Sequence, residues 1–309
     1  MSKPIIVGYD PATSDRAPVN FGVAAARFTG APLIVASVGA ALDGQDAGQQ
    51  HEDLVPDATQ ARDEAERLLE PEGISVECRA LTGTSAARAL HETSEAEDAG
   101  LLVVGSTRRG AVGRLVPGST AERLMHGAPC PIAIVPPGWE RGAGLSTIGV
   151  AYVDTEEGRE ALRSAHALAR RAGASLRVLT AVKAGLAMYA ETEAGTPGRR
   201  GKEFEEVEGE LRVRAEAALR RATDALGDDV PVETDAFVED PADVLIGVSE
   251  HLDLLVCGSR GYGPLRAVLL GGVSRRLTAE ARCPVLVIPR GVTGSLEALM
   301  EASPGAAAR

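Results

Sequence analysis

A chain of 309 residues, 44% of them apolar, is long enough for two globular domains that each bury their own core. The formal net charge of −12 argues against a broad nucleic-acid surface, which needs clustered Lys and Arg. One small phosphate site built from backbone amides remains compatible with that charge.

The N-terminus and the cysteines predict a cytoplasmic protein. Met1-Ser2-Lys3-Pro4 leads directly into the apolar run Ile5–Val7, so no signal peptide is expected. No apolar run approaches the roughly 20 residues that a membrane helix needs. None of the four cysteines belongs to a C-x-x-C pair, which favours buried thiols in a reducing cytosol over the alternative, a redox pair.

The first half of the chain predicts strands that alternate with helices. The predicted strands are Ile5–Asp10, Leu33–Val38, Ile74–Leu81, Leu101–Gly105 and Pro131–Val135. One predicted helix begins after Asp15 and ends at about Phe28. The other predicted helices are Ala58–Leu69, Ser85–Glu97 and Ser119–His126.

The second half predicts the same order of elements. Its strands are Ile148–Val153, Leu176–Val182, Val232–Val238, Leu254–Gly258 and Val285–Ile288. Its helices are Glu157–Arg171, Glu203–Leu226, Asp243–Glu250 and Val273–Ala281. The glycines and proline of Lys183–Lys202 predict a mobile surface loop. We therefore expect domains at residues 1–138 and 147–290, a linker at 139–146 and a flexible tail at 291–309.

The two halves are copies of one another. Leu102–Pro136 recurs as Leu255–Pro289 at a constant offset of 153, and 12 of these 35 pairs are identical. The N-terminal parts align at an offset of 143, where Tyr9 matches Tyr152 and Gly30 matches Gly173. Because solenoid repeats run roughly 20–50 residues, a period this long indicates a duplicated domain.

The strands are apolar throughout rather than alternating, which indicates parallel sheets covered by helices on both faces. Right-handed crossovers then make each half a doubly wound α/β domain. Ligands bind such sheets beyond the carboxyl ends of the strands, where the strand order reverses. A glycine-rich segment begins at the carboxyl end of the fourth strand in each half, which is a suitable place for a ligand.

The glycine-rich segments share one spacing. The second copy reads Gly258-Ser259-Arg260-Gly261, nine residues, then Gly271-Gly272-Val273-Ser274 at the start of a helix. The first copy reads Gly105-Ser106-Thr107-Arg108, nine residues, then Gly118-Ser119-Thr120. Small residues let the backbone approach an anion, and the dipole of the following helix favours phosphate. The repeated spacing favours a phosphate-binding role over ordinary turn glycines.

At these segments the chain resembles the universal stress protein family. Nucleotide-binding members carry Gly-2x-Gly-9x-Gly-Ser/Thr after the fourth strand and an Asp at the end of the first. The family's entry to the fifth strand is matched by Ala128-Pro129-Cys130-Pro131 and Ala281-Arg282-Cys283-Pro284. The resemblance covers roughly residues 3–136 and 147–289.

The resemblance implies two tandem domains, each a five-stranded parallel sheet in the order 3-2-1-4-5 with helices on both faces. It also implies ATP, with or without Mg²⁺, bound at the point where the strand order reverses. It further implies that the two domains pair through their fifth strands, and it leaves a homodimer of the whole chain open.

The first copy departs from the nucleotide-binding pattern at one position. It keeps Asp10, Gly105, Gly118 and Ser119, but Arg108 stands where the second glycine belongs. Arg108 either pairs with a phosphate as a charged donor or fills the cradle and blocks binding. Asp10 either contacts the nucleoside end of the ligand or caps the next turn.

The second copy departs elsewhere. It keeps Gly258, Gly261 and Gly271, but Gly272 replaces the Ser/Thr and Val153 occupies the Asp position. Asp154, one residue later, and the hydroxyl of Ser274 are the candidate substitutes. On the glycine spacing alone, the second copy is the first place to look for a nucleotide.

Val38 and Ala181 end the second strands of the two halves and match the family position that meets the base. They are equally suited to be ordinary core residues.

The sequence predicts no catalytic machinery. The five histidines show no metal-ligand spacing, and no nucleophile elbow or Walker loop is present. We therefore expect a non-enzymatic protein that binds an adenine nucleotide in a stress-response signalling or protective role. The alternative is an interaction scaffold whose sites have decayed, and slow ATP hydrolysis is a third hypothesis. No nucleic acid, membrane or metal-ion partner other than Mg²⁺ is expected.

Overall fold

The computed structural model describes residues 3–10, 15–40, 59–60, 62–67, 69, 74–109, 115–117, 119–125, 127–140, 142, 144–183, 197–259, 272–292 and 294–301. Side chains are described for these residues except 40, 107–109, 115–117, 119, 197–205, 274, 295, 297 and 301.

Five strands of the first half form a parallel arrangement. They are β1 (Ile5–Tyr9), β2 (Leu33–Ala40), β3 (Val76–Gly83), β4 (Leu101–Gly105) and β7 (Ile132–Val135). Their order is β3-β2-β1-β4-β7, and every neighbouring pair is parallel. The strand order reverses between β1 and β4, so the carboxyl ends of these two strands form the switch point of this half.

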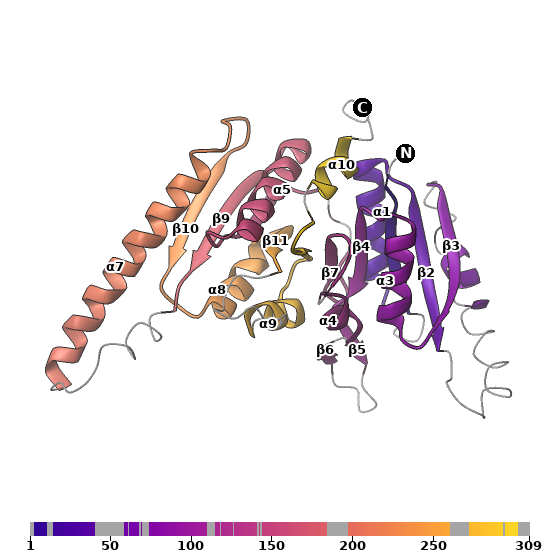
Figure 1. Cartoon of the computed structure of the whole chain (residues 1–309), viewed down its shortest axis with the longest axis horizontal. Helices are drawn as coiled ribbons and strands as arrows, with labels where there is room; N and C mark the ends of the chain where they lie inside the picture. The colour runs from indigo at the N-terminus through magenta and orange to yellow at the C-terminus, as the bar shows by residue number, and fades with distance from the viewer. Residues whose placement is uncertain are drawn as a thin grey trace.

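The second half repeats this arrangement and joins the first. Its strands are β8 (Thr147–Ala151), β9 (Ser175–Ala181), β10 (Val232–Phe237), β11 (Leu254–Gly258) and β12 (Val285–Ile288). Their order is β10-β9-β8-β11-β12, again all parallel. Strand β12 runs antiparallel to β7, with Leu286 opposite Ala133, so the two halves share one ten-stranded sheet (Figure 1). This pairing covers two strands that would otherwise be edges.

Helices cover both faces of the sheet. The helices are α1 (Ala17–Thr29), α3 (Ala86–Ala96), α4 (Ser119–Met125), α5 (Glu156–Ala172), α7 (Pro197–Thr223), α8 (Pro241–Val248), α9 (Gly272–Glu280) and α10 (Ser295–Glu301). Residues of α1, α5, α7 and α10 share one core with Val7, and residues of α3, α4, α8 and α9 share the other with Ile6. Because neighbouring strand residues point to opposite faces, both must be apolar. Within the described segments, no helix has the length and apolar character needed to cross a membrane.

The ends of the first helices show the duplication directly. Gly30 after α1 and Gly173 after α5 both adopt the left-handed conformation, with φ of 70° and 65°. These glycines end both helices at equivalent positions because a residue with a Cβ disfavours that conformation. Nearby, Arg171 of α5 donates from Nη2 to the carbonyl oxygen of Phe28 at 3.1 Å, so the ends of the two helices meet.

Two segments differ from the sequence predictions. The first glycine-rich segment contains a short antiparallel hairpin of β5 (Thr107–Arg109) and β6 (Leu115–Pro117). Helix α7 begins at Pro197, so the last part of the predicted loop Lys183–Lys202 is helical. Proline is tolerated there because the first turn of a helix needs no backbone donor. The remainder of that loop, residues 184–196, lies outside the described part of the chain.

The prediction of a flexible tail is wrong for residues 295–301, which form α10. Leu296, Leu299 and Met300 of this helix are buried. Leu299 Cδ1 approaches Gly100 of the first half so closely that a Cβ there would lie 2.5 Å from it. On the other side, Glu160 of α5 accepts a hydrogen bond from the amide of Gly294 at 3.0 Å. The C-terminal helix therefore packs against both halves, as Figure 1 shows for its position beside α5.

Candidate functional site

The fold brings two predicted site residues of the first half together. Asp10 directly follows β1 and is exposed, and Gly105 ends β4. Strands β1 and β4 are neighbours with Val7 level with Val103, so both residues lie at the same carboxyl edge. This edge is the switch point that the sequence predicts as a ligand site.

A carboxylate lies over the glycine that ends β4. A Cβ added to Gly105 would lie 3.4 Å from Pro18 Cγ and 4.0 Å from Asp15 Oδ2. The other oxygen of Asp15 accepts hydrogen bonds from the amides of Ala17 at 3.0 Å and Gly138 at 3.4 Å. Asp15 thus connects the start of α1, the end of β4 and the segment that leaves β7. This contact could not be predicted from the sequence, because it depends on where α1 begins relative to β4.

Two buried hydroxyl groups of the first half have no hydrogen-bond partner among the described residues. They are Ser106 Oγ, directly after β4, and Ser37 Oγ, on β2 level with Tyr9. Leaving a buried hydroxyl unpaired costs roughly 1–3 kcal/mol. The amide of Ser106 already donates to the carbonyl of Val135 at 2.9 Å, so the hydroxyl is the polar group of this residue that lacks a partner among the described residues. A polar ligand at this edge fits the residues present.

In the second half, the residue considered as a substitute for the strand-ending Asp is engaged by its neighbours. Asp154 accepts from Arg159 Nη2 at 2.7 Å and from Tyr152 Oη at 3.2 Å. Both hydrogen bonds lower the pKa of Asp154, and the one from Arg159 has the larger effect. A ligand hydroxyl would have to compete with an arginine for this carboxylate.

The first turn of α5 packs onto the glycine that ends β11. A Cβ added to Gly258 would lie 3.0 Å from the carbonyl carbon and oxygen of Glu157. Helix α5 begins at Glu156, whereas the position aligned with the start of α1 at Ala17 is Glu160, so α5 has four more residues at this end (160 − 156). The backbone of this extra turn therefore packs against the glycine that ends β11, and the Glu157 carboxylate pairs with Arg290 at 3.6 Å.

The remaining predicted residues divide into three groups. Val38 is half-buried on β2 and Ala181 is buried on β9, so both belong at least partly to the core. Arg108 lies in β5 opposite Val116, Ser119 begins α4, Gly272 begins α9 and Ser274 lies within α9. Gly118, Gly261 and Gly271 lie outside the described residues. Among the residues that are described, no group of three His, Cys, Asp or Glu side chains could hold a metal ion.

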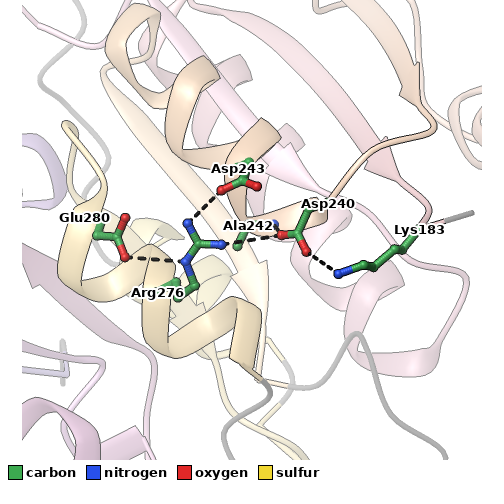
Figure 2. A network of polar contacts seen from close by, with 6 residues as sticks. All are labelled: Lys183, Asp240, Ala242, Asp243, Arg276 and Glu280. Atoms are coloured by element: carbon green, nitrogen blue, oxygen red, sulfur yellow. Dashed lines mark hydrogen bonds and ion pairs between the residues drawn. The ribbon is translucent and has the colours of Figure 1, made fainter. Parts of the chain in front are cut away.

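A charged network that the sequence analysis missed lies near the end of β9 (Figure 2). Asp240 accepts from the amide of Ala242 at 3.0 Å, capping α8, and from Lys183 Nζ at 2.9 Å. Arg276 of α9 lies 3.6 Å from Asp240, donates to Asp243 at 2.7 Å and approaches Glu280 at 3.4 Å. Position 40 of the first half, which aligns with Lys183, is alanine, so this network distinguishes the second half.

We expect Asp240→Ala to lower the free energy of unfolding by about 1 kcal/mol at pH 7, because α8 loses its N-cap. The hydrogen bond from Lys183 lowers the pKa of Asp240, so its carboxylate stabilises the fold above the unfolded value of about 3.9. This contribution is lost as the pH falls through the lower folded pKa. Urea denaturation of both proteins from pH 7 to pH 2 should therefore show the difference between them shrinking.

The control for Asp240 is Asp243→Ala, which removes one exposed ion-pair partner of Arg276 and leaves the cap in place. Its expected effect is below about 0.5 kcal/mol. Equal losses for the two variants, or a difference that does not depend on pH, would contradict the role assigned to Asp240.

Comparison with known proteins gives one family for both halves. The model of the universal stress protein family matches residues 1–136 and 144–289. A universal stress protein of Mycolicibacterium smegmatis is 30% identical over 227 residues, which cover 72% of each chain. One from Mycobacterium tuberculosis is 27% identical over 313 residues, covering 93% of this chain and 99% of the relative. The crystal structure of a universal stress protein from Archaeoglobus fulgidus superposes with a TM-score of 0.63 at 17% identity, covering 94% of this chain and 97% of that one. At that identity, the superposition supports the fold alone.

Proposed function

Because the chain belongs to the universal stress protein family, as a tandem member, we propose that it binds an adenine nucleotide at the switch point of its first half. The proposed ligand is ATP, together with Mg²⁺, and the proposed role is stress-response signalling or protection. The observation that carries this proposal is the buried hydroxyl of Ser106, which has no partner among the described residues and lies beside Gly105 and Asp10.

The comparison of the two copies favours the first as the binding site. On the glycine spacing alone the second copy is the better candidate, but the described residues favour the opposite choice. In the second copy, the backbone of Glu157 packs against Gly258, with its carbonyl carbon and oxygen 3.0 Å from where a Cβ would be. Ser259, the counterpart of Ser106, is half-buried, whereas Ser106 is buried.

Four residues of the first half have proposed roles in binding the nucleotide. Asp10 would accept hydrogen bonds from the ribose hydroxyls, and Ser106 would donate to a phosphate oxygen. Gly105 would let a phosphate approach the backbone because it has no side chain of its own. Pro18 Cγ and Asp15 Oδ2 would be its neighbours, at 3.4 and 4.0 Å from where a Cβ would be. Val38 would contact the base from β2.

The proposed role of the second half is not nucleotide binding. Its strand β12 covers β7, so the tandem chain supplies within one molecule the pairing that a single domain would need from a second chain. We infer that the second half stabilises the first and presents surfaces to a partner, which retains the scaffold hypothesis for this half alone. The site residues proposed here bind and orient a nucleotide; none is assigned a catalytic role.

Calorimetric titration of the full chain with ATP and Mg²⁺ tests the proposal. Asp10→Ala and Ser106→Ala should each weaken binding about tenfold, since each removes hydrogen bonding to the ligand worth about 1.4 kcal/mol. The matched changes in the second half, Asp154→Ala and Ser259→Ala, should leave the affinity unchanged. The proposal fails if no heat appears at protein concentrations well above about 10 μM, or if only the second-half variants weaken binding.

A further inference from the structure

Both halves hold the chain that leaves the fifth strand with an acidic side chain from the start of the first helix. In the first half, Asp15 accepts a hydrogen bond from the amide of Gly138, three residues after β7. In the second half, Glu157 pairs with Arg290, two residues after β12. The two acids do not align in sequence, since Asp15 aligns with Gly158, yet both lie against the glycine that ends the fourth strand of their half.

The residue held by Asp15, Gly138, directly precedes the linker between the two halves. Trp139 follows Gly138 and packs edge-on against Phe21 of α1, with ring centroids 5.4 Å apart and the ring planes at 64°. Asp15 also accepts a hydrogen bond from the amide of Ala17. One carboxylate therefore holds both the residue before the linker and the start of the helix against which Trp139 packs. The linker is therefore attached to the switch point of the first half.

We propose that Asp15 couples occupancy of the first-half site to the position of the interdomain linker. A phosphate in contact with the backbone at Gly105 would occupy space next to Asp15 Oδ2, which lies 4.0 Å from the Cβ position of that glycine. The two groups are both negatively charged, so crowding and repulsion act in the same direction. The carboxylate withdraws, the long hydrogen bond from Gly138 breaks, and Trp139 moves relative to Phe21. This inference rests on the proposed nucleotide site of the first half.

The chain contains a single tryptophan, so its fluorescence reports on the linker alone. Titrating the full chain with ATP and Mg²⁺ should change the emission of Trp139 along a saturating curve, with the same midpoint as calorimetric binding. Asp15→Asn keeps an acceptor for the amides of Ala17 and Gly138 but removes the negative charge. It should bind ATP several-fold more tightly and show less than half of the wild-type emission change. Glu92→Gln, which neutralises an exposed partner of Arg88, should behave as the wild type.

Calorimetry and Trp139 fluorescence together distinguish failure of the coupling from failure of the nucleotide site. If calorimetry detects binding while the emission of Trp139 stays constant, the coupling is wrong and the nucleotide site stands. The coupling is also wrong if Asp15→Asn matches the wild type in both affinity and emission change. If calorimetry detects no binding, the nucleotide site itself is wrong and the coupling falls with it.

Discussion

Gly158→Ala should lower the free energy of unfolding by about 3 kcal/mol, the upper part of the usual range for overpacking. A Cβ at this position would lie 1.9 Å from the carbonyl oxygen of Val153 and 3.0 Å from its carbonyl carbon. No side-chain rotation relieves this clash, because both partners are backbone atoms. The start of α5 would have to move away from the backbone of Val153, two residues after β8, disturbing the hydrogen bond from the amide of Gly158 to Thr155 Oγ1.

The control for this prediction is Gly209→Ala in α7, where an added Cβ meets no described atom within 4 Å. A glycine inside a helix is less favourable than alanine, so this change should stabilise the fold by about 0.5–1 kcal/mol. Urea denaturation followed by circular dichroism measures both. Indistinguishable midpoints for the two variants would contradict the close approach of Gly158 to the backbone of Val153.

Leu299→Ala should destabilise the fold by about 2–5 kcal/mol, as other large-to-small changes in cores do. Leu299 is 1% exposed although it lies ten residues from the C-terminus, and it contacts the backbone at Gly100 in the first half. Helix α10 has only seven residues, so its stability must come from packing rather than from helix propensity. Loss of this side chain should also loosen the contact between α10 and the buried Glu160.

Val213→Ala in α7 is the matched control for Leu299, because Val213 is 61% exposed. Its expected effect lies within about 0.5 kcal/mol. A negligible effect of Leu299→Ala in thermal or urea denaturation would mean that the C-terminal helix does not dock in solution.

The α/β class and the helices on both faces could be predicted from the sequence. The reason is visible in β1, where Ile6 and Val7 enter the cores on opposite faces. The hairpin of β5 and β6 could not be predicted, because strands of three residues show no periodicity. Helix α10 carried a usable signal, since Leu296, Leu299 and Met300 have the spacing of one helical face. That signal was outweighed by the polar, glycine-containing residues around it.

The candidate site could be predicted only in part. The topology places Asp10 and Gly105 at one edge, as expected for residues that end neighbouring strands. The positions of Asp15 and Glu157 could not be predicted, because they depend on a tertiary contact between the first helix and the fourth strand. The same contact changed which half we propose as the binding site. The glycine spacing favours the second half. The structure shows that the backbone of Glu157 packs against Gly258 in that half, which the spacing does not reveal.

The most direct test of nucleotide binding in the first half is equilibrium dialysis of the purified full chain against labelled ATP with Mg²⁺, counting the nucleotides bound per chain at saturation. We predict one nucleotide per chain, with saturation shifted about tenfold to higher ATP by Asp10→Ala and left unchanged by Asp154→Ala. Two nucleotides per chain, none, or a single one whose binding depends on Asp154 rather than Asp10 would contradict the proposed site.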